Sequence, residues 1–401
     1  MQERKPVTDW ATDYDIFDKH YVENPTEVWA ELRDKCPIAH TERMEGSWLP
    51  TKFEDLQAFV GMVPALSSKD PIVVPPMDIS DEERGADGGA PPITADPPQQ
   101  NAYRRAILPF FTVKAVAKHR QFTEDLCHDL INRFHNTGKA DAAADYAQQI
   151  PPRVIGHMLG IDPNRTDEFT QWVRNVLEFG LTDIDLRMKY RVVIRDFFFE
   201  TVADRRKNMG DEDLISKLIL SEVDGRKLDD NQIVSMCNLL LVAGIDTTWS
   251  SIGAALWHFA AHEDDRKRLS ADHSLFPTAI EEMLRYYAPV TMARVATEDI
   301  EYKGVTIKEG DKVLMNFPGA CHDPDMFEDA DKVVIDRQKN RHIAFGAGIH
   351  RCAGSNLARM EMDVALRVWF ERMPEFELSD PEKVTWAGGQ VRGPRTVPVR
   401  F

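Results

Sequence analysis

Long apolar runs are missing from this 401-residue chain, and no stretch approaches the roughly 18 residues that a membrane-spanning helix needs. Residues 1–10 lack the apolar stretch of a signal peptide or an anchor. The five cysteines show no paired spacing, which argues against a disulfide framework and for a reducing compartment. Positive charge is scarce too: 49 Lys and Arg face 66 Asp and Glu, so the net charge is −17. We therefore expect a soluble cytoplasmic protein that binds neither nucleic acid nor membrane.

Repeats at a fixed period and a convincing interdomain linker are also lacking. Pro and Gly are spread through the chain, and their densest patch, within residues 75–98, is too short to separate large domains. Hydrophobic residues make up 43% of the chain, enough for a sizeable core. Although the length alone favours two domains, we expect residues 1–401 to form a single one.

Helical periodicity dominates what is present. The expected helices cover residues 26–36, 114–136, 164–180, 186–207, 229–262, 277–287 and 354–373. Strand-like segments are few, and the clearest lie at 300–302, 305–307 and 312–315 in a hairpin-like pattern, with Gly304 and Gly310 at the turns. Residues 70–98 are expected to form a long irregular loop. The fold class is therefore predicted to be mainly α with small β-sheets.

One cysteine has unusual surroundings. Residues 345–354 read Phe-Gly-Ala-Gly-Ile-His-Arg-Cys-Ala-Gly, and a helical pattern follows at once. Glycine allows turns in which backbone amides approach a sulfur closely, and a nearby helix N-terminus favours the thiolate by lowering the thiol pKa. A single Cys is usually a small buried apolar residue. We interpret four cysteines in that way: Cys36, Cys127, Cys237 and Cys321.

A second signal interrupts the longest expected helix. Residues 239–250 read Leu-Leu-Leu-Val-Ala-Gly-Ile-Asp-Thr-Thr-Trp-Ser, which places polar residues and Gly244 in the middle of an element roughly 50 Å long. Gly alone costs about 1 kcal/mol relative to Ala in a helix. Either function requires these residues, or Asp246 or Thr247 caps a second, shorter helix.

The glycine-rich loop around Cys352 resembles the haem-binding loop of the cytochrome P450 superfamily, in its soluble bacterial, ferredoxin-dependent type. This resemblance implies a P450 fold, with haem b between the long central helix and the Cys loop with its following helix. It implies that Cys352 is the thiolate ligand of the iron. The aromatic ring of Phe345 would pack by the sulfur within the loop that Gly346 shapes, and His350 would bind a haem propionate.

The interrupted helix resembles the oxygen-binding stretch of the same family. The resemblance implies that Gly244 leaves room beside the iron and that the Thr247 hydroxyl delivers protons. Asp246 would be the acid that relays them. Proton supply matters because one oxygen atom must leave as water.

Further segments match the family in register. Glu282 and Arg285 would form a structural ion pair with Arg337, although an isolated pair of this spacing usually lies on the surface. Arg294 and Arg104 would neutralise the haem propionates, since the guanidinium can bind a carboxylate bidentately. Many members carry His where this chain has Gln100, so that position is expected to provide a hydrogen bond instead of a charge.

The substrate pocket implied by the resemblance is mostly apolar, and the same residues could equally be ordinary core. Its expected members are Val242, Ala243, Val290, Met292 and Val391. We therefore expect a haem-thiolate monooxygenase that uses dioxygen to hydroxylate, or oxidatively dealkylate, a hydrophobic small molecule. No fused reductase is expected, so electrons would come from a ferredoxin and an NAD(P)H-dependent ferredoxin reductase. A peroxide-driven haem-thiolate peroxygenase and a non-catalytic haem ligand sensor are the alternatives.

Overall fold

The computed structural model describes residues 5–74, 89–210, 212–223 and 225–401. Residues 75–88 of the expected 70–98 loop lie outside the described residues, and its two described ends contain no helix or strand. The α-helices are α1 (Trp10–Asp13), α2 (Lys19–Glu23), α3 (Pro25–Lys35), α4 (Phe53–Gly61), α6 (Gln99–Ile107), α7 (Val113–Ala117), α8 (Arg120–Asn132), α9 (Ile150–Leu159), α10 (Thr166–Leu177), α11 (Ile184–Lys207), α12 (Leu214–Leu220), α13 (Asp230–Ala261), α14 (Glu263–Ala271), α15 (Phe276–Tyr286), α16 (Phe317–Ala320) and α17 (Ser355–Arg372).

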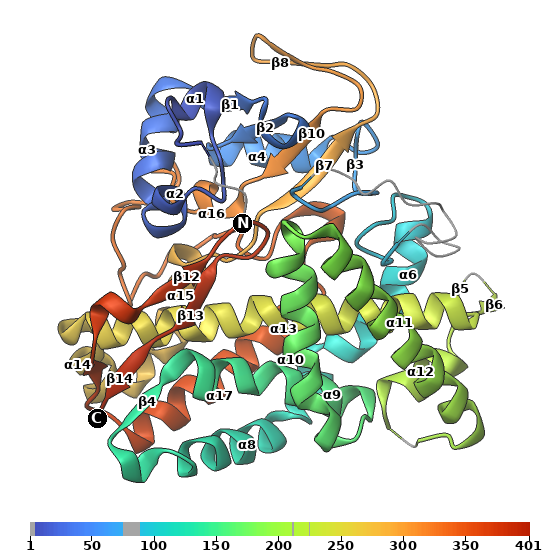
Figure 1. Cartoon of the computed structure of the whole chain (residues 1–401), viewed down its shortest axis with the longest axis vertical. Helices are drawn as coiled ribbons and strands as arrows, with labels where there is room; N and C mark the ends of the chain where they lie inside the picture. Colours follow the sequence, from blue (N-terminus) through green and yellow to red (C-terminus); the bar gives the residue numbers. More distant parts are fainter. Residues whose placement is uncertain (1–4, 75–88, 211, 224) are drawn as a thin grey trace.

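Helix α13 crosses the whole molecule, with α1, α2, α3 and α4 on one side of it and α8, α9 and α17 on the other (Figure 1). It begins with a capping box, in which Asp229 and Gln232 satisfy each other's backbone amides. The helix is continuous through the polar stretch because the hydroxyls bond within it: Thr247 Oγ1 donates to the Ala243 carbonyl at 2.8 Å. The two-helix alternative is therefore wrong. Among the described residues, this one helix is apolar and long enough to span a membrane, but 72% of the relevant window is buried inside the protein.

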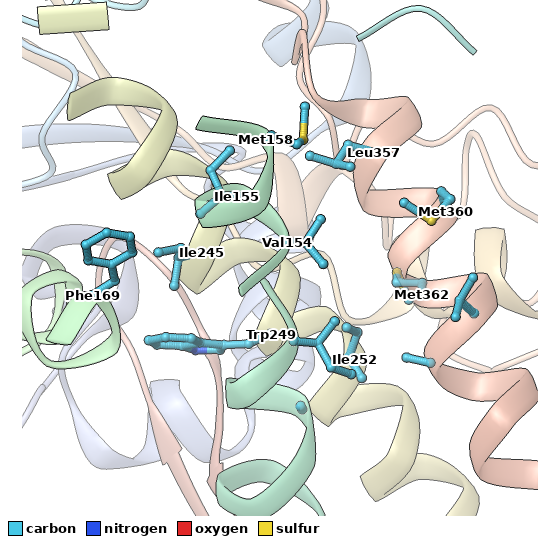
Figure 2. Packing of buried hydrophobic residues seen from close by; sticks show 14 of the residues in the cluster. Val154, Ile155, Met158, Phe169, Ile245, Trp249, Ile252, Leu357, Met360 and Met362 are labelled. Atoms are coloured by element: carbon cyan, nitrogen blue, oxygen red, sulfur yellow. The ribbon is translucent and has the colours of Figure 1, made fainter. Parts of the chain in front are cut away.

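The main core joins α13 to α9, α10 and α17 (Figure 2). Large side chains fill the space between these helices, and Trp249 of α13 is only 1% exposed. The packed residues shown are Val154, Ile155, Met158, Phe169, Ile245, Trp249, Ile252, Leu357, Met360 and Met362. Close packing of this kind is intolerant of volume changes. It therefore holds α17, which follows the Cys loop, at a set distance from the middle of α13.

Short strands form several small sheets, of which the largest lies at the opposite end of the molecule from α8 and α17 (Figure 1). They are β1 (Ile38–Thr41), β2 (Ser47–Pro50), β3 (Leu66–Ser67), β4 (Lys139–Asp141), β5 (Glu222–Val223), β6 (Arg226–Lys227), β7 (Met292–Ala296), β8 (Ile300–Tyr302), β9 (Val305–Ile307), β10 (Lys312–Met315), β11 (Glu377–Leu378), β12 (Thr385–Ala387), β13 (Gly393–Thr396) and β14 (Pro398–Arg400). The largest sheet has the order β1-β2-β10-β7-β3.

The predicted hairpin is confirmed only in its first half. Strands β8 and β9 pair antiparallel around Gly304, whose φ of 85° suits glycine. After Gly310 the chain leaves this hairpin, and β10 pairs instead with β7 and β2. All four residues of β10 are buried, so the strand needs a central place in a larger sheet.

The expected structural ion pair is buried in the core beside the Cys loop. Arg285 Nε and Nη2 donate to the two Glu282 oxygens at 2.9 and 2.8 Å, and Arg337 Nε donates to the same carboxylate at 3.0 Å. Arg285 also donates to three backbone carbonyls, while the Val334 amide donates to Glu282. Every strong donor and acceptor of this cluster thus has a partner.

Candidate functional site

A partly open cavity of about 240 Å³ separates the Cys loop from the middle of α13. Cys352 lies on one wall, and Gly244 and Thr247 lie on the wall that faces it. The six loop residues that line it with Cys352 are Phe345, Gly346, Ala347, His350, Ala353 and Gly354. Two segments about 100 positions apart in the sequence are thereby brought to one space.

The Cys loop is shaped by left-handed glycines and by a backbone bond at the cysteine. Gly346 and Gly348 have φ values of 68° and 64°, and the Cys352 amide donates to the Phe345 carbonyl at 2.8 Å. The guanidinium of Arg359, one turn into α17, lies 4.5 Å from the centre of the Phe345 ring. Loop, ring and helix therefore hold the sulfur in one position at the cavity wall.

The expected lowering of the Cys352 pKa is wrong for the chain by itself. Burial raises the pKa of this thiol, and it outweighs the Gly354 amide and the nearby Arg104, Arg351 and Arg359, which all lower it. Cys352 is nevertheless exposed at the cavity wall, so its sulfur is accessible to a metal bound in the cavity, and a bound cation would favour the thiolate.

Cationic and polar side chains gather at one edge of the cavity. Arg294 is 8% exposed, and its Nη1 donates to the neighbouring Ala293 carbonyl at 2.7 Å. His350 Nε2 is buried without a hydrogen-bond partner in the described chain. Burial, together with Arg294 and Arg104, lowers the pKa of His350 to about 4, so the ring is neutral at pH 7. Two arginines and an unpaired ring nitrogen suit the two carboxylates of haem b.

Gln100 lies behind this edge and braces the loop. Its Nε2 donates to the Ile349 carbonyl at 2.8 Å, and the residue is fully buried. Its Oε1 has no hydrogen-bond partner among the described residues. Arg104, which does line the cavity, donates in the same way to the Arg351 carbonyl. Helix α6 therefore supports the Cys loop through two backbone carbonyls.

The opposite wall is open at Gly244. A Cβ added there would meet no protein atom closer than 3.9 Å, the nearest being Ile155 Cδ1. Close packing between protein elements therefore does not require glycine at this position. The Thr247 side chain beside it reaches the same cavity.

Asp246 points away from the cavity. It is fully buried, and its carboxylate binds Arg395 Nη2 at 3.0 Å and accepts from the Ser250 hydroxyl at 3.1 Å. Arg395 Nε in turn binds Glu178 at 2.9 Å, and Glu178 is paired with Arg174 on α10. Burial raises the pKa of Asp246, while Arg395 opposes that rise. Sequence reasoning missed Arg395, which lies in β13 near the C-terminus and has no local signal linking it to α13.

A second cavity, of about 210 Å³, continues from the first along α13. The two share the lining residues Ile93, Leu239, Ala243, Thr247, Val290 and Met292. The structure brings all five predicted pocket residues to these walls: Val242 and Val391 line the second cavity, and the other three line both. The backbone bridge between Val290 and Val391 joins two of the predicted segments.

Comparison with known proteins agrees with this arrangement. The family model described as Cytochrome P450 matches residues 164–385. Mycinamicin IV hydroxylase/epoxidase of Micromonospora griseorubida is 30% identical over 384 residues, covering 92% of this chain and 94% of the relative. Steroid C26-monooxygenase of Mycobacterium tuberculosis is 34% identical over 298 residues, covering 73% and 80%. The structure of the Bacillus subtilis bacillaene polyketide synthase cytochrome P450 PksS has a TM-score of 0.88 at 30% identity and covers 96% of this chain and 99% of that chain.

The chain belongs to the cytochrome P450 family. It is a haem-dependent monooxygenase, with haem b as its cofactor and a hydrophobic substrate and dioxygen as its reactants. The predicted fold class, mainly helical with small sheets, is confirmed.

Proposed function

We propose that Cys352 is the thiolate ligand of the haem iron and that the cavity opposite Thr247 is where substrate is hydroxylated or oxidatively dealkylated. The observation that carries this proposal is the placement of Cys352 and Thr247 on facing walls of one cavity. Haem b, when bound, supplies the iron at which dioxygen is activated. The unpaired His350 nitrogen and the buried Arg294 support a propionate site at its edge.

The chain's own residues have separate tasks in this proposal. Arg104, Arg294 and His350 bind the propionates, while Gln100 braces the loop from behind. The Thr247 hydroxyl donates its only hydrogen to the Ala243 carbonyl, so it faces the cavity as an acceptor, and it passes a proton into the cavity only when it turns away from that carbonyl. Asp246 relays protons only when its carboxylate releases Arg395 and turns towards Thr247.

The mostly apolar walls of the pocket orient the hydrophobic substrate and exclude water. The predicted members, Val242, Ala243, Val290, Met292 and Val391, line this space together. The names of the relatives mention mycinamicin IV, a steroid and a polyketide synthase, which supports a large hydrophobic substrate here.

We propose further that residues 1–401 act as one cytoplasmic haem domain that takes electrons from a separate ferredoxin and its NAD(P)H-dependent reductase. Arg351 is exposed directly beside Cys352, which gives an acidic partner a basic contact close to the sulfur. The burial of α13 in the core supports the expectation that it does not enter a membrane.

Replacing the sulfur tests the central assignment. The haem-loaded Cys352→Ser protein is expected to lose the thiolate signature of its reduced carbon-monoxide spectrum, whereas Cys36→Ser, outside both cavities, retains it. An unaltered spectrum in Cys352→Ser contradicts the proposal.

Turnover separates the monooxygenase from its alternatives. Product is expected with NAD(P)H, ferredoxin and reductase under air. Product formed only with peroxide, and not with NAD(P)H, ferredoxin and reductase, would indicate the peroxygenase. Binding of the substrate without product under either condition would indicate the sensor.

A further inference from the structure

The second cavity has a basic end that the family resemblance did not predict. Lys69, Arg187 and Arg191 line it, and Asp70 is the one acidic residue among its described lining. The Asp70 carboxylate is already bound by Lys312 Nζ at 3.1 Å. On a chain with a net charge of −17, this excess of positive charge inside an apolar cavity calls for an explanation.

Arg187 is the informative member of this group. It is 6% exposed, yet its guanidinium has no hydrogen bond or ion pair with any described residue. Burial and the neighbouring Arg191 lower the pKa of Arg187 to about 10, and Asp70 opposes this, so the side chain remains charged at pH 7. The N–H donors of this guanidinium therefore line the cavity without an acceptor from the described residues, and either water or the carboxylate of a ligand can supply one.

The backbone is built to place Arg187 at this point. A Cβ on Gly180 would lie 2.7 Å from Arg187 Cβ and 2.3 Å from the Asn175 carbonyl oxygen. Only glycine therefore allows the first turn of α11 to approach the end of α10 this closely. That approach brings Arg187 against the cavity wall.

Asn238 adds a second unpaired polar group on the facing helix. It lines the same cavity, and its Oδ1 is buried without a hydrogen-bond partner among the described residues. The amide oxygen and nitrogen can exchange places by a flip, so the side chain can present an N–H to the cavity. Asn238 precedes Thr247 by nine residues on α13, a rise of about 14 Å along the helix.

We propose that Arg187 and Asn238 bind a carboxylate at the far end of a hydrophobic substrate, whose other end reaches the oxidation site beside Thr247. The planar guanidinium can hold a carboxylate bidentately, and the Asn238 amide supplies another donor. The apolar walls between the two ends, which include Val242, Val290 and Leu239, would enclose the hydrocarbon body. This inference rests on the proposed function, because it assigns the polar end of the substrate to the same site.

Matched ligands and variants test it on the haem-loaded protein at pH 8. The probes are decanoic, dodecanoic and tetradecanoic acids, each with its methyl ester and its primary alcohol. Dissociation constants come from isothermal titration calorimetry and from the spin-state change of the haem. Each acid is expected to bind about 10-fold to 100-fold more tightly than its ester or alcohol, the range for a hydrogen bond to a charged group.

Arg187→Gln is expected to remove this preference while leaving the dissociation constants of the alcohols within about 2-fold. Arg195→Gln is the matched control, because Arg195 lies on the same helix, outside both cavities, paired with Asp196. Asn238→Asp, which places a like charge opposite the carboxylate, is expected to weaken acid binding about 10-fold and provides a second readout if Arg187→Gln does not fold.

Three results would overturn the proposal: equal binding of acid and ester, an equal loss for acid and alcohol in Arg187→Gln, or no binding of any acid. The thiolate carbon-monoxide spectrum, measured on the same samples, reports on the proposed haem ligation independently. A normal thiolate spectrum without a preference for the acids would contradict only the carboxylate site. A preference for the acids in calorimetry without the thiolate spectrum would contradict only the haem-thiolate assignment.

Discussion

Two buried polar regions of this molecule contrast in how fully they are satisfied. Around Glu282, the carboxylate accepts from Arg285, Arg337, Asn340 and a backbone amide, so its lone pairs are occupied by protein. At the far end of the second cavity, the buried Arg187 has no hydrogen-bonding or ion-pair partner among the described residues. Both regions bury charge, but only the first supplies its own counter-groups.

This difference distinguishes buried polar groups that stabilise the fold from buried polar groups that bind a ligand. A buried polar group that the chain itself satisfies stabilises one arrangement of the backbone, as Arg285 does by holding three carbonyls between residues 321 and 332. A buried polar group left unpaired is rare in folded proteins and indicates an absent partner. By the same criterion, His350 at the haem edge and Asn238 in the second cavity each hold a buried polar atom without a partner among the described residues.

The largest effect on stability is expected from disrupting the hydrogen-bonded cluster around Glu282. Glu282→Gln removes the charge that pairs with the fully buried Arg285, and leaving such a charge uncompensated costs about 3–5 kcal/mol. Urea unfolding of the haem-loaded protein should show this loss in the free energy of unfolding. The control is Glu309→Gln, an exposed residue, with an expected change within about 0.5 kcal/mol. Equal midpoints for the two variants would refute a structural role for the cluster.

Low pH is expected to weaken the ion pair between Arg359 and Glu281, which supports the Cys loop. Arg359, which lies over Phe345, binds both oxygens of Glu281 at 2.6 and 2.8 Å. Burial alone would raise the pKa of Glu281, but the hydrogen bonds from Arg359 and His342 hold it at about 2, below its ordinary value of 4.5. Because the folded-state pKa is the lower one, this contribution to stability is complete above pH 4.5 and is lost as the pH falls towards about 2.

Comparison with Glu281→Gln checks this prediction. The wild-type free energy of unfolding should exceed that of the variant at pH 7, and the difference should shrink between pH 4.5 and pH 3. A difference that is independent of pH would show that Glu281 acts through its shape and not through its charge.

Thr247→Val tests whether the Thr247 hydroxyl on the cavity wall takes part in proton delivery. The change keeps the volume and removes the hydroxyl that lines the cavity, so proton delivery should weaken. The share of NAD(P)H electrons recovered in product should fall about 10-fold, with a matching rise in hydrogen peroxide. Thr201→Val is the control, because that hydroxyl makes an equivalent bond to the Phe197 carbonyl on α11, outside both cavities. Equal coupling in both variants would remove Thr247 from the proton path.

The sequence predicted those parts of the site that depend on local pattern. The Cys loop and the polar stretch of α13 each carry short-range motifs, and the long helix was expected within a residue of its observed end. The partners of Asp246 were not predictable, because Arg395 reaches α13 from 149 positions away through a strand with no distinctive pattern. Arg187 was missed for a similar reason: in sequence it is one of several basic residues on α11, and only its burial distinguishes it.

The smallest effect is expected at Gly244, where one substitution should increase stability and hinder the access of a ligand to the haem. Because an added Cβ meets no protein atom within 3.9 Å, Gly244→Ala should raise the free energy of unfolding by up to about 1 kcal/mol through helix propensity. The same methyl group enters the cavity, so the haem-loaded variant should bind carbon monoxide more slowly. Gly253→Ala on the same helix is the matched control: its Cβ would lie 3.1 Å from Pro394 Cγ, so crowding should offset the gain while carbon monoxide binding stays unchanged. If Gly244→Ala instead fails to raise the free energy of unfolding, as expected for Gly253→Ala, then Gly244 is required for packing against its protein neighbours.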